Sequence, residues 1–170
     1  MNISSKFKDA VDKITDIGYK WYEEVLIDNA EFNVPYIKKT ILDLPKLNSK
    51  KSNSAIIVSA GPSLHNLDTI NRIKDAKYKG TLIAIDGSYI RLLKHNIIPD
   101  YVLTLDPHPT RSVRWFGDPD FTNNMQNDDY FDRQELDVDF RNNSSVENIN
   151  NINLVNQYSS RTKLVICCAS

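Results

Sequence analysis

The chain has 170 residues, of which 41% are hydrophobic and 25% are charged, with a formal net charge of -1. This composition is ordinary for a globular protein and gives no basis for nucleic acid as a partner. There is no signal-peptide pattern, and no apolar run approaches the ~18 residues that span a membrane, so we expect a cytoplasmic protein that does not associate with membranes. Cys167 and Cys168, adjacent in an apolar run, are expected to be buried thiols.

Apolar residues recur at steps of three and four from Phe7 to Val25 and predict a long amphipathic helix over about 5–28. Pro35 is expected to interrupt this helix, and residues 36–42 are expected to form a shorter one. The apolar stripe of the long helix has to be covered by the rest of the chain or by a second copy. A homodimer through the N-terminal helix is therefore one of two expected arrangements.

Beyond a polar, aperiodic connector, strand-like and helix-like patterns alternate. Strands are predicted at Ala55–Val58, Thr81–Ile85, Tyr101–Leu105 and Lys163–Ala169, with helices from Ser63 to Ile73, at Tyr89–His95 and within the asparagine-rich stretch 141–156. The alternation implies right-handed crossovers, so we expect an α/β fold with a Rossmann-like parallel sheet and flanking helices. The chain then divides into a helical arm with its linker (1–53) and a nucleotide-binding domain (54–170). A doubly wound domain normally continues past a fourth strand, so we expect this fold to be truncated at the C-terminus.

The first strand ends in a turn made of Ser59, Ala60, Gly61, Pro62 and Ser63. Glycine permits backbone angles that other residues avoid, proline fixes its own φ, and serine accepts hydrogen bonds from the first N–H groups of a helix. Free N–H groups at the positive end of a helix dipole bind phosphate or carboxylate groups. We expect this turn to hold a nucleotide phosphate, and the alternative is a tight turn that binds nothing.

Asp86-Gly87-Ser88 and Asp106-Pro107-His108 follow the second and third strands. Because the carboxyl ends of parallel strands lie along one edge of a sheet, we expect both segments to join the Gly61 turn in one site. Asp86 and Asp106 suit a hydrated Mg²⁺, although Asp86 has two alternatives, which are holding a ribose hydroxyl and capping its strand. His108 is a candidate general acid or base, or a metal ligand beside Asp106, and a solvent-bonded loop residue is its alternative.

Three segments resemble, in order and spacing, the signatures of the MptE-like domain family. They are Ser59-Ala-Gly-Pro-Ser-Leu64, Ala84-Ile-Asp-Gly-Ser88 and Ile98-Pro-Asp-Tyr-Val-Leu-Thr-Leu-Asp-Pro107. The family includes 6-hydroxymethylpterin diphosphokinases and the motility accessory factors linked to flagellin glycosylation, and the helical arm followed by Asn33-Val-Pro35 resembles the lead-in of the latter. The glycine-proline-serine loop is also more distantly similar to the loop with which one group of bacterial sialyltransferases holds a cytidine nucleotide.

The resemblance implies a nucleotide-dependent transferase that passes a diphosphoryl group from ATP to a hydroxymethylpterin-like small-molecule acceptor with Mg²⁺ and releases AMP. The nucleotide-binding residues would be Ser59, Ala60, Gly61, Pro62, Ser63, Asp86, Gly87 and Ser88, the metal ligands Asp86 and Asp106, and the catalytic residues Asp106 and His108. A glycosyltransferase that uses a nucleotide-activated nonulosonic acid, with His108 as base, is the second expectation. A non-catalytic nucleotide-binding or assembly module is the third.

Overall fold

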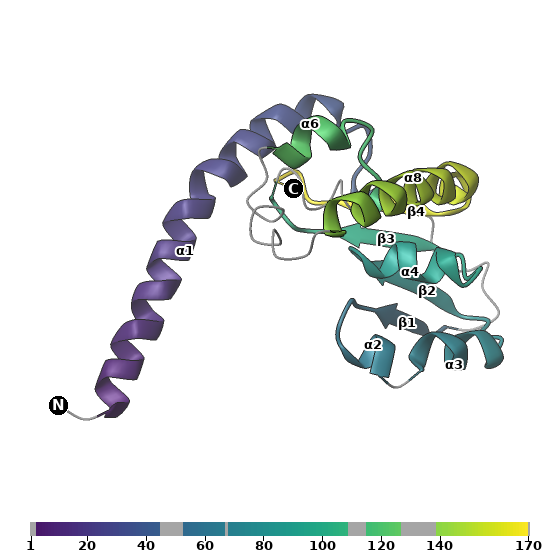
Figure 1. Cartoon of the computed structure of the whole chain (residues 1–170), viewed down its shortest axis with the longest axis horizontal. Helices are drawn as coiled ribbons and strands as arrows, with labels where there is room; N and C mark the ends of the chain where they lie inside the picture. The colour runs from purple at the N-terminus through teal and green to yellow at the C-terminus, as the bar shows by residue number, and fades with distance from the viewer. Residues whose placement is uncertain (1–2, 45–52, 67, 109–114, 127–138, 170) are drawn as a thin grey trace.

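A computed structural model of the chain describes residues 3–44, 53–66, 68–108, 115–126 and 139–169. A parallel sheet with its packed helices forms the body of the molecule, and a long N-terminal helix extends from it (Figure 1). In chain order the helices and strands are α1 (Ile3–Asn33), β1 (Ala55–Val58), α2 (Ser63–Asn66), α3 (Thr69–Asp75), β2 (Thr81–Ile85), α4 (Ser88–Lys94), β3 (Tyr101–Thr104), α6 (Phe121–Gln126), α8 (Phe140–Tyr158) and β4 (Lys163–Ile166).

The four strands form one parallel sheet in the order β1-β2-β3-β4, which confirms the predicted Rossmann-like α/β class. β1 and β2 have the predicted bounds, whereas β3 and β4 end earlier than predicted, at Thr104 and Ile166. Cys167 and Cys168 therefore lie beyond the last strand, and the prediction that both are buried is wrong, because Cys167 is exposed. Since all three strand pairs are parallel, the carboxyl ends of the four strands lie along one edge.

The core lies on one face of the sheet. The strand register pairs Val58 with Ala84 and Ala84 with Val102, and all three side chains are buried on this face. The helices contribute the rest of the core, with Leu64 from α2, Ile70 from α3, Leu92 and Leu93 from α4, and the partly buried Leu154 and Val155 from α8. Right-handed crossovers that advance in one direction place their helices on the same face. Ile57, on the opposite face of β1, is accordingly 65% exposed.

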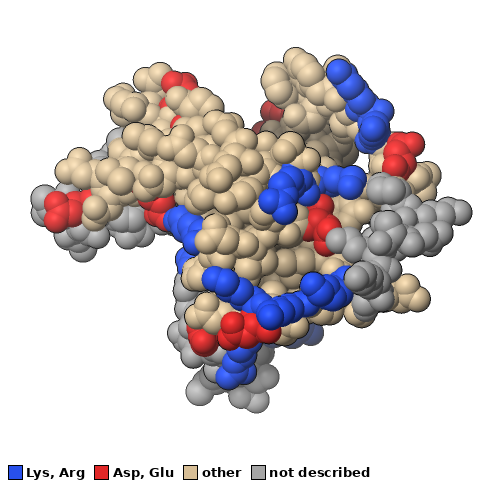
Figure 2. Space-filling model, turned by 90° about the vertical axis from the view of Figure 1, so that its right-hand side faces the viewer, with Lys and Arg blue, Asp and Glu red and all other residues tan. Residues whose placement is uncertain are grey.

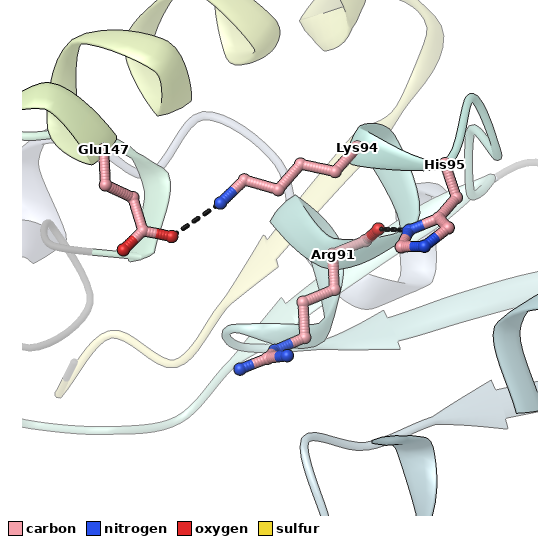
Figure 3. A network of polar contacts seen from close by, with 4 residues as sticks. All are labelled: Arg91, Lys94, His95 and Glu147. Atoms are coloured by element: carbon pink, nitrogen blue, oxygen red, sulfur yellow. Dashed lines mark hydrogen bonds and ion pairs between the residues drawn. The ribbon is translucent and has the colours of Figure 1, made fainter. Parts of the chain in front are cut away.

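α8 packs beside α4, and an ion pair joins their outer surfaces (Figure 3). Lys94 Nζ lies 2.6 Å from Glu147 Oε1, and the Glu147 side chain is 61% exposed. Such an exposed pair contributes at most about 1 kcal/mol. At the C-terminal end of α4, Nδ1 of His95 donates to the carbonyl oxygen of Arg91 at 2.8 Å and so satisfies a carbonyl group that the helix leaves open.

Two predicted helices differ from the observed ones. The helix predicted from Ser63 to Ile73 is divided into α2 and α3, because Asp68 adopts a left-handed φ of 52° between them and its carboxylate accepts a hydrogen bond from Asn71. Residues 36–42, predicted as a helix, instead overlap two short 3₁₀ turns, Val34–Tyr36 and Ile41–Asp43, and residues 37–40 between the turns have no regular structure. Thr40 caps the start of the second turn: its Oγ1 accepts from Leu42 N–H, and its own N–H donates to the Asp43 carboxylate. This cap begins a separate turn at Ile41, so no continuous helix forms.

α1 is longer than predicted and ends at Asn33, where Pro35 was expected to interrupt it. Its C-terminal end is attached to the body, because the side chains of Asn29 and Asn33 donate hydrogen bonds to backbone carbonyl groups beyond β3 and β4. Its N-terminal half extends away from the body (Figure 1), and Phe7 and Ile14 on this half are 72% and 70% exposed. Among the described residues, no helix has the length and apolar character needed to cross a membrane.

Candidate functional site

The turns that follow β1, β2 and β3 lie along the same edge of the sheet. These strands are adjacent and parallel, so their carboxyl ends lie side by side. The three predicted segments, 59–63, 86–88 and 106–108, are these turns. The structure therefore brings the predicted site residues to the edge at which open α/β sheets bind ligands.

The turn after β1 uses two of its own N–H groups internally. Gly61 N–H donates to the carbonyl oxygen of Ser59 at 2.9 Å, and Leu64 N–H donates to that of Gly61 at 3.0 Å. The prediction of an open ring of N–H donors is therefore wrong for these two groups. α2 has only four residues, so its dipole adds little. Ser59, Ala60, Pro62 and Ser63 are nevertheless exposed, which leaves the outer surface of the turn accessible.

Neither a left-handed φ nor crowding by the described residues requires a glycine at position 61. Its φ lies outside the left-handed region, contrary to the sequence expectation that it adopts angles closed to other residues. Among the described residues, the nearest atom to a Cβ built at this position is Ser63 Oγ at 3.9 Å, which is an ordinary contact. A glycine also leaves the backbone open to close approach from outside.

Ser88 connects the turns after β1 and β2 from the inside. Its hydroxyl donates to the carbonyl oxygen of Val58 at 2.6 Å and accepts from Ile85 N–H at 2.9 Å, and the residue is fully buried. Val58 directly precedes Ser59, so Ser88 holds the Gly61 turn beside Asp86. The Ser88 hydroxyl, which the sequence analysis assigned to nucleotide binding, is thus already bonded to two backbone groups. Its observed role is to hold the ends of β1 and β2 together.

Asp86 presents an unsatisfied carboxylate oxygen at the end of β2. The residue has a left-handed φ of 47°, and its N–H donates to the carbonyl oxygen of Leu103 at 2.9 Å. Its Oδ1 is buried but has no hydrogen-bond partner among the described residues. A buried polar atom without a partner is unfavourable, so a cation or a donor on a ligand fits here.

The carboxylates at this edge suit Mg²⁺ only when a substrate supplies further oxygen ligands. The described part of the chain contains no group of three or more side chains of the metal-binding types. Mg²⁺ is commonly held by one or two carboxylates together with water and substrate phosphate oxygens. Asp86 and Asp106, at the ends of neighbouring strands, match that pattern.

Asp106, Pro107 and His108 form a turn that α1 holds from outside. Asp106 Oδ1 accepts the backbone N–H of His108 at 2.9 Å, and the carbonyl oxygen of Pro107 accepts from the Asn29 side chain at 2.9 Å. Asp106 and His108 are both partly buried. A carboxylate and an imidazole are therefore present at the same edge as Asp86.

An aromatic residue that no sequence pattern indicated lies on this edge as well. The indole of Trp115 packs on Gly87, where a Cβ atom would lie 3.3 Å from Cδ1 and 3.4 Å from Nε1. The next residue, Phe116, packs on Tyr89 of α4 with a centroid separation of 5.7 Å. Gly87 and Trp115 are far apart in the chain, so the only sequence signal is a glycine after Asp86 that permits a close contact.

A second surface feature lies on the opposite edge, at the amino ends of β2 and β3. A hollow of about 480 Å³ opens there, and Lys and Arg side chains gather on this side of the molecule (Figure 2). Both α3 and α4 end at the hollow, and lysines at helix C-termini complement the negative end of the dipole. The residues that line it include Lys74, Lys77, Lys79, Asn96 and Asp100. The hollow is therefore separated from the candidate site by the length of the strands.

The chain matches the family model described as 6-hydroxymethylpterin diphosphokinase MptE-like over residues 28–123, more than half of its length. The match begins inside α1 just before Asn29, and it includes all three turns and Trp115. No curated protein and no solved structure matches the chain. The MptE-like resemblance is thus shown, whereas the similarity to bacterial sialyltransferases is not.

Proposed function

Because the chain belongs to the MptE-like family, we propose that it is a Mg²⁺-dependent transferase that moves a diphosphoryl group from ATP to the hydroxyl of a hydroxymethylpterin-like acceptor. The observation that carries the proposal is the buried Oδ1 of Asp86, which has no partner among the described residues. Ser88 holds this carboxylate beside the exposed Gly61 turn. A polyphosphate with its bound cation supplies what both features need.

The proposed reaction is a substitution at the β-phosphorus of ATP. The hydroxymethyl oxygen of the acceptor bonds to that phosphorus, the bond from this phosphorus to the oxygen that bridges it to the α-phosphorus breaks, and AMP leaves. The hydroxyl proton passes to a base, for which His108 is the candidate at the end of β3. Mg²⁺, when bound, neutralises negative charge on the phosphate oxygens.

The chain's own residues position the two substrates. The exposed surface from Ser59 to Ser63 faces the polyphosphate, and Gly61 allows it to approach the backbone. Asp86 and Asp106 hold the cation, and Asp106 Oδ1 also fixes the backbone of His108 through their hydrogen bond.

AMP release tests the proposal directly. We expect AMP to form when the chain is given ATP, Mg²⁺ and a hydroxymethylpterin together, and the rate to fall at least about 100-fold in Asp86→Asn, because the cation loses a charged ligand. Asp75→Asn, which neutralises an exposed carboxylate at the end of α3, is the matched control and leaves the rate unchanged. Absence of AMP release with every pterin acceptor would refute the proposal.

Thermal stability with different ligands separates this proposal from its alternatives. A ligand at 100 times its Kd stabilises the folded state by about 2.7 kcal/mol. Stabilisation by ATP with Mg²⁺ supports the diphosphokinase proposal, whereas stabilisation by a cytidine nucleotide alone supports a glycosyltransferase that uses a nucleotide-activated nonulosonic acid. Stabilisation by a nucleotide without AMP release supports a non-catalytic nucleotide-binding module, and no response to any nucleotide supports an assembly module.

A further inference from the structure

We propose that the indole of Trp115 is an aromatic wall of the site, on which the planar heterocycle of a bound substrate stacks. The inference rests on the proposed function, because both a hydroxymethylpterin and the adenine of ATP present such a ring. Binding measured separately for ATP and for the hydroxymethylpterin distinguishes the two rings. The proposal adds to the three turns a residue that contributes flat apolar surface.

Trp115 lies against the turn that carries Asp86. The nearest atoms to a Cβ built at Gly87 are Cδ1, Nε1 and Cγ of the Trp115 indole, at 3.3, 3.4 and 3.5 Å. Gly87 has φ -60° and ψ -12°, which any residue adopts, so its backbone does not need glycine. The absence of a side chain at Gly87 instead makes room for the indole.

The segment that follows Trp115 is firmly attached to the body. Phe116 packs on the buried Tyr89, and Gly117 comes close to Ile152 of α8. Asp118 exchanges two hydrogen bonds with the buried Asn148, from its N–H to Oδ1 at 2.7 Å and from Nδ2 to its carbonyl oxygen at 2.9 Å. These contacts anchor the backbone next to Trp115, and the indole itself lies against Gly87 at the carboxyl edge of the sheet.

The indole is not part of the hydrophobic core. The core cluster takes in Phe116 as a partly buried neighbour but does not include Trp115, which stays partly exposed. The Trp115 indole contacts Gly87, the residue that follows Asp86, whose buried Oδ1 has no partner among the described residues. Small-molecule sites combine apolar surface with a few polar groups in the same way.

Binding measured by calorimetry tests the inference. We expect Trp115→Ala to weaken binding of the stacked ligand about 5- to 100-fold, the range found when one stacking aromatic is truncated, and Trp115→Phe to stay within about threefold of the wild type. Inorganic tripolyphosphate, which has no ring, is the internal control and should bind both variants equally. Gly87→Ala, which crowds the indole without removing it, should also weaken the ring-bearing ligand. Tyr36→Ala, which removes an exposed aromatic ring from a 3₁₀ turn, is the matched control.

The outcomes separate this inference from the proposed function. A loss confined to ATP assigns the stacking to adenine, and a loss confined to the hydroxymethylpterin assigns it to the pterin ring. If the wild type binds both ligands and Trp115→Ala binds them equally well, the stacking role is refuted while the proposed function stands. An equal loss for tripolyphosphate also refutes it, because the substitution would then act through the fold. If the wild type binds neither ligand, the proposed function fails and this inference fails with it.

Discussion

Asn29 donates a hydrogen bond from its side-chain amide to the carbonyl oxygen of Pro107 at 2.9 Å and so ties the N-terminal helix to the turn that carries Asp106 and His108. The same nitrogen lies 3.1 Å from the carbonyl oxygen of Ala169. An amide group has two N–H donors, and here both are used. The helical arm therefore joins the chain beyond β3 to the chain beyond β4, at the edge that holds the candidate site.

Asn29→Asp removes both donors, keeps the size of the side chain and sets a carboxylate against two carbonyl oxygens. We expect it to lower the free energy of unfolding by about 2–3 kcal/mol, and Asn29→Ala by about 1–2 kcal/mol, in urea denaturation. Glu31→Ala, at an exposed position of the same helix, is the control and should change the free energy of unfolding by less than about 0.5 kcal/mol. Equal stability of all three variants would show that the amide does not hold the arm in place.

Ser88→Ala should destabilise the fold and also loosen the site. The change leaves the carbonyl oxygen of Val58 and the N–H of Ile85 without their buried partner, so we expect a loss of about 2–3 kcal/mol in chemical denaturation. Nucleotide affinity should fall too, because the turn that contains Gly61 is no longer held beside Asp86. Ser63→Ala, at an exposed position, is the comparison and should leave the stability within about 0.5 kcal/mol of wild type. A Ser88→Ala variant as stable as the wild type would contradict the bridging role.

Two glycine-to-alanine substitutions should have opposite consequences. Gly117 has a φ of +96°, and a Cβ there would lie 2.5 Å from Cγ1 and 2.6 Å from the backbone nitrogen of Ile152. Gly117→Ala should therefore cost about 3 kcal/mol or more. Gly61→Ala should fold as stably as the wild type, because its Cβ meets only Ser63 Oγ at 3.9 Å, but should bind tripolyphosphate more weakly. Unchanged tripolyphosphate binding by Gly61→Ala would remove this turn from the proposed phosphate site.

The sequence predicted the strands well because each one is a short apolar run bounded by polar, glycine or proline residues. β1 and β2 show this most clearly, since their limits follow directly from the pattern. The parallel order then follows from the alternation with helices, and the shared edge follows from the parallel order. The prediction that residues 59–63, 86–88 and 106–108 lie at one edge of the sheet is therefore confirmed.

Contacts between distant residues explain what the sequence did not predict. The Ser88 hydroxyl reaches Val58, and Trp115 covers Gly87, and no local period links the members of either pair. The asparagine-rich stretch predicted as a short helix is the 19-residue α8, because Asn148 and Asn151 are buried and Asn148 bonds to the backbone of Asp118. Such tertiary contacts override the weak helix propensity of asparagine. Asp118 is likewise buried, with 4% of its surface exposed.

Self-association through α1 is the remaining prediction from the structure. Phe7 and Ile14 are two turns apart on one side of the half of α1 that extends beyond the body (Figure 1), and both are largely exposed. An isolated helix is marginal in water unless its apolar side is covered, and a second copy of the chain presents the same stripe.

Light scattering should therefore give a molar mass that rises with concentration towards twice the 19.5 kDa of one chain. The double substitution of Phe7 and Ile14 by glutamate should return it to a single chain, because two charges would enter the buried seam. Ile27→Glu places a charge on the opposite side of the same helix, at a residue that is already 52% exposed, and should leave the association unchanged. A wild-type chain that stays at 19.5 kDa at high concentration would exclude the homodimer, and loss of association in Ile27→Glu as well would show that the contact does not follow the Phe7 and Ile14 side of α1.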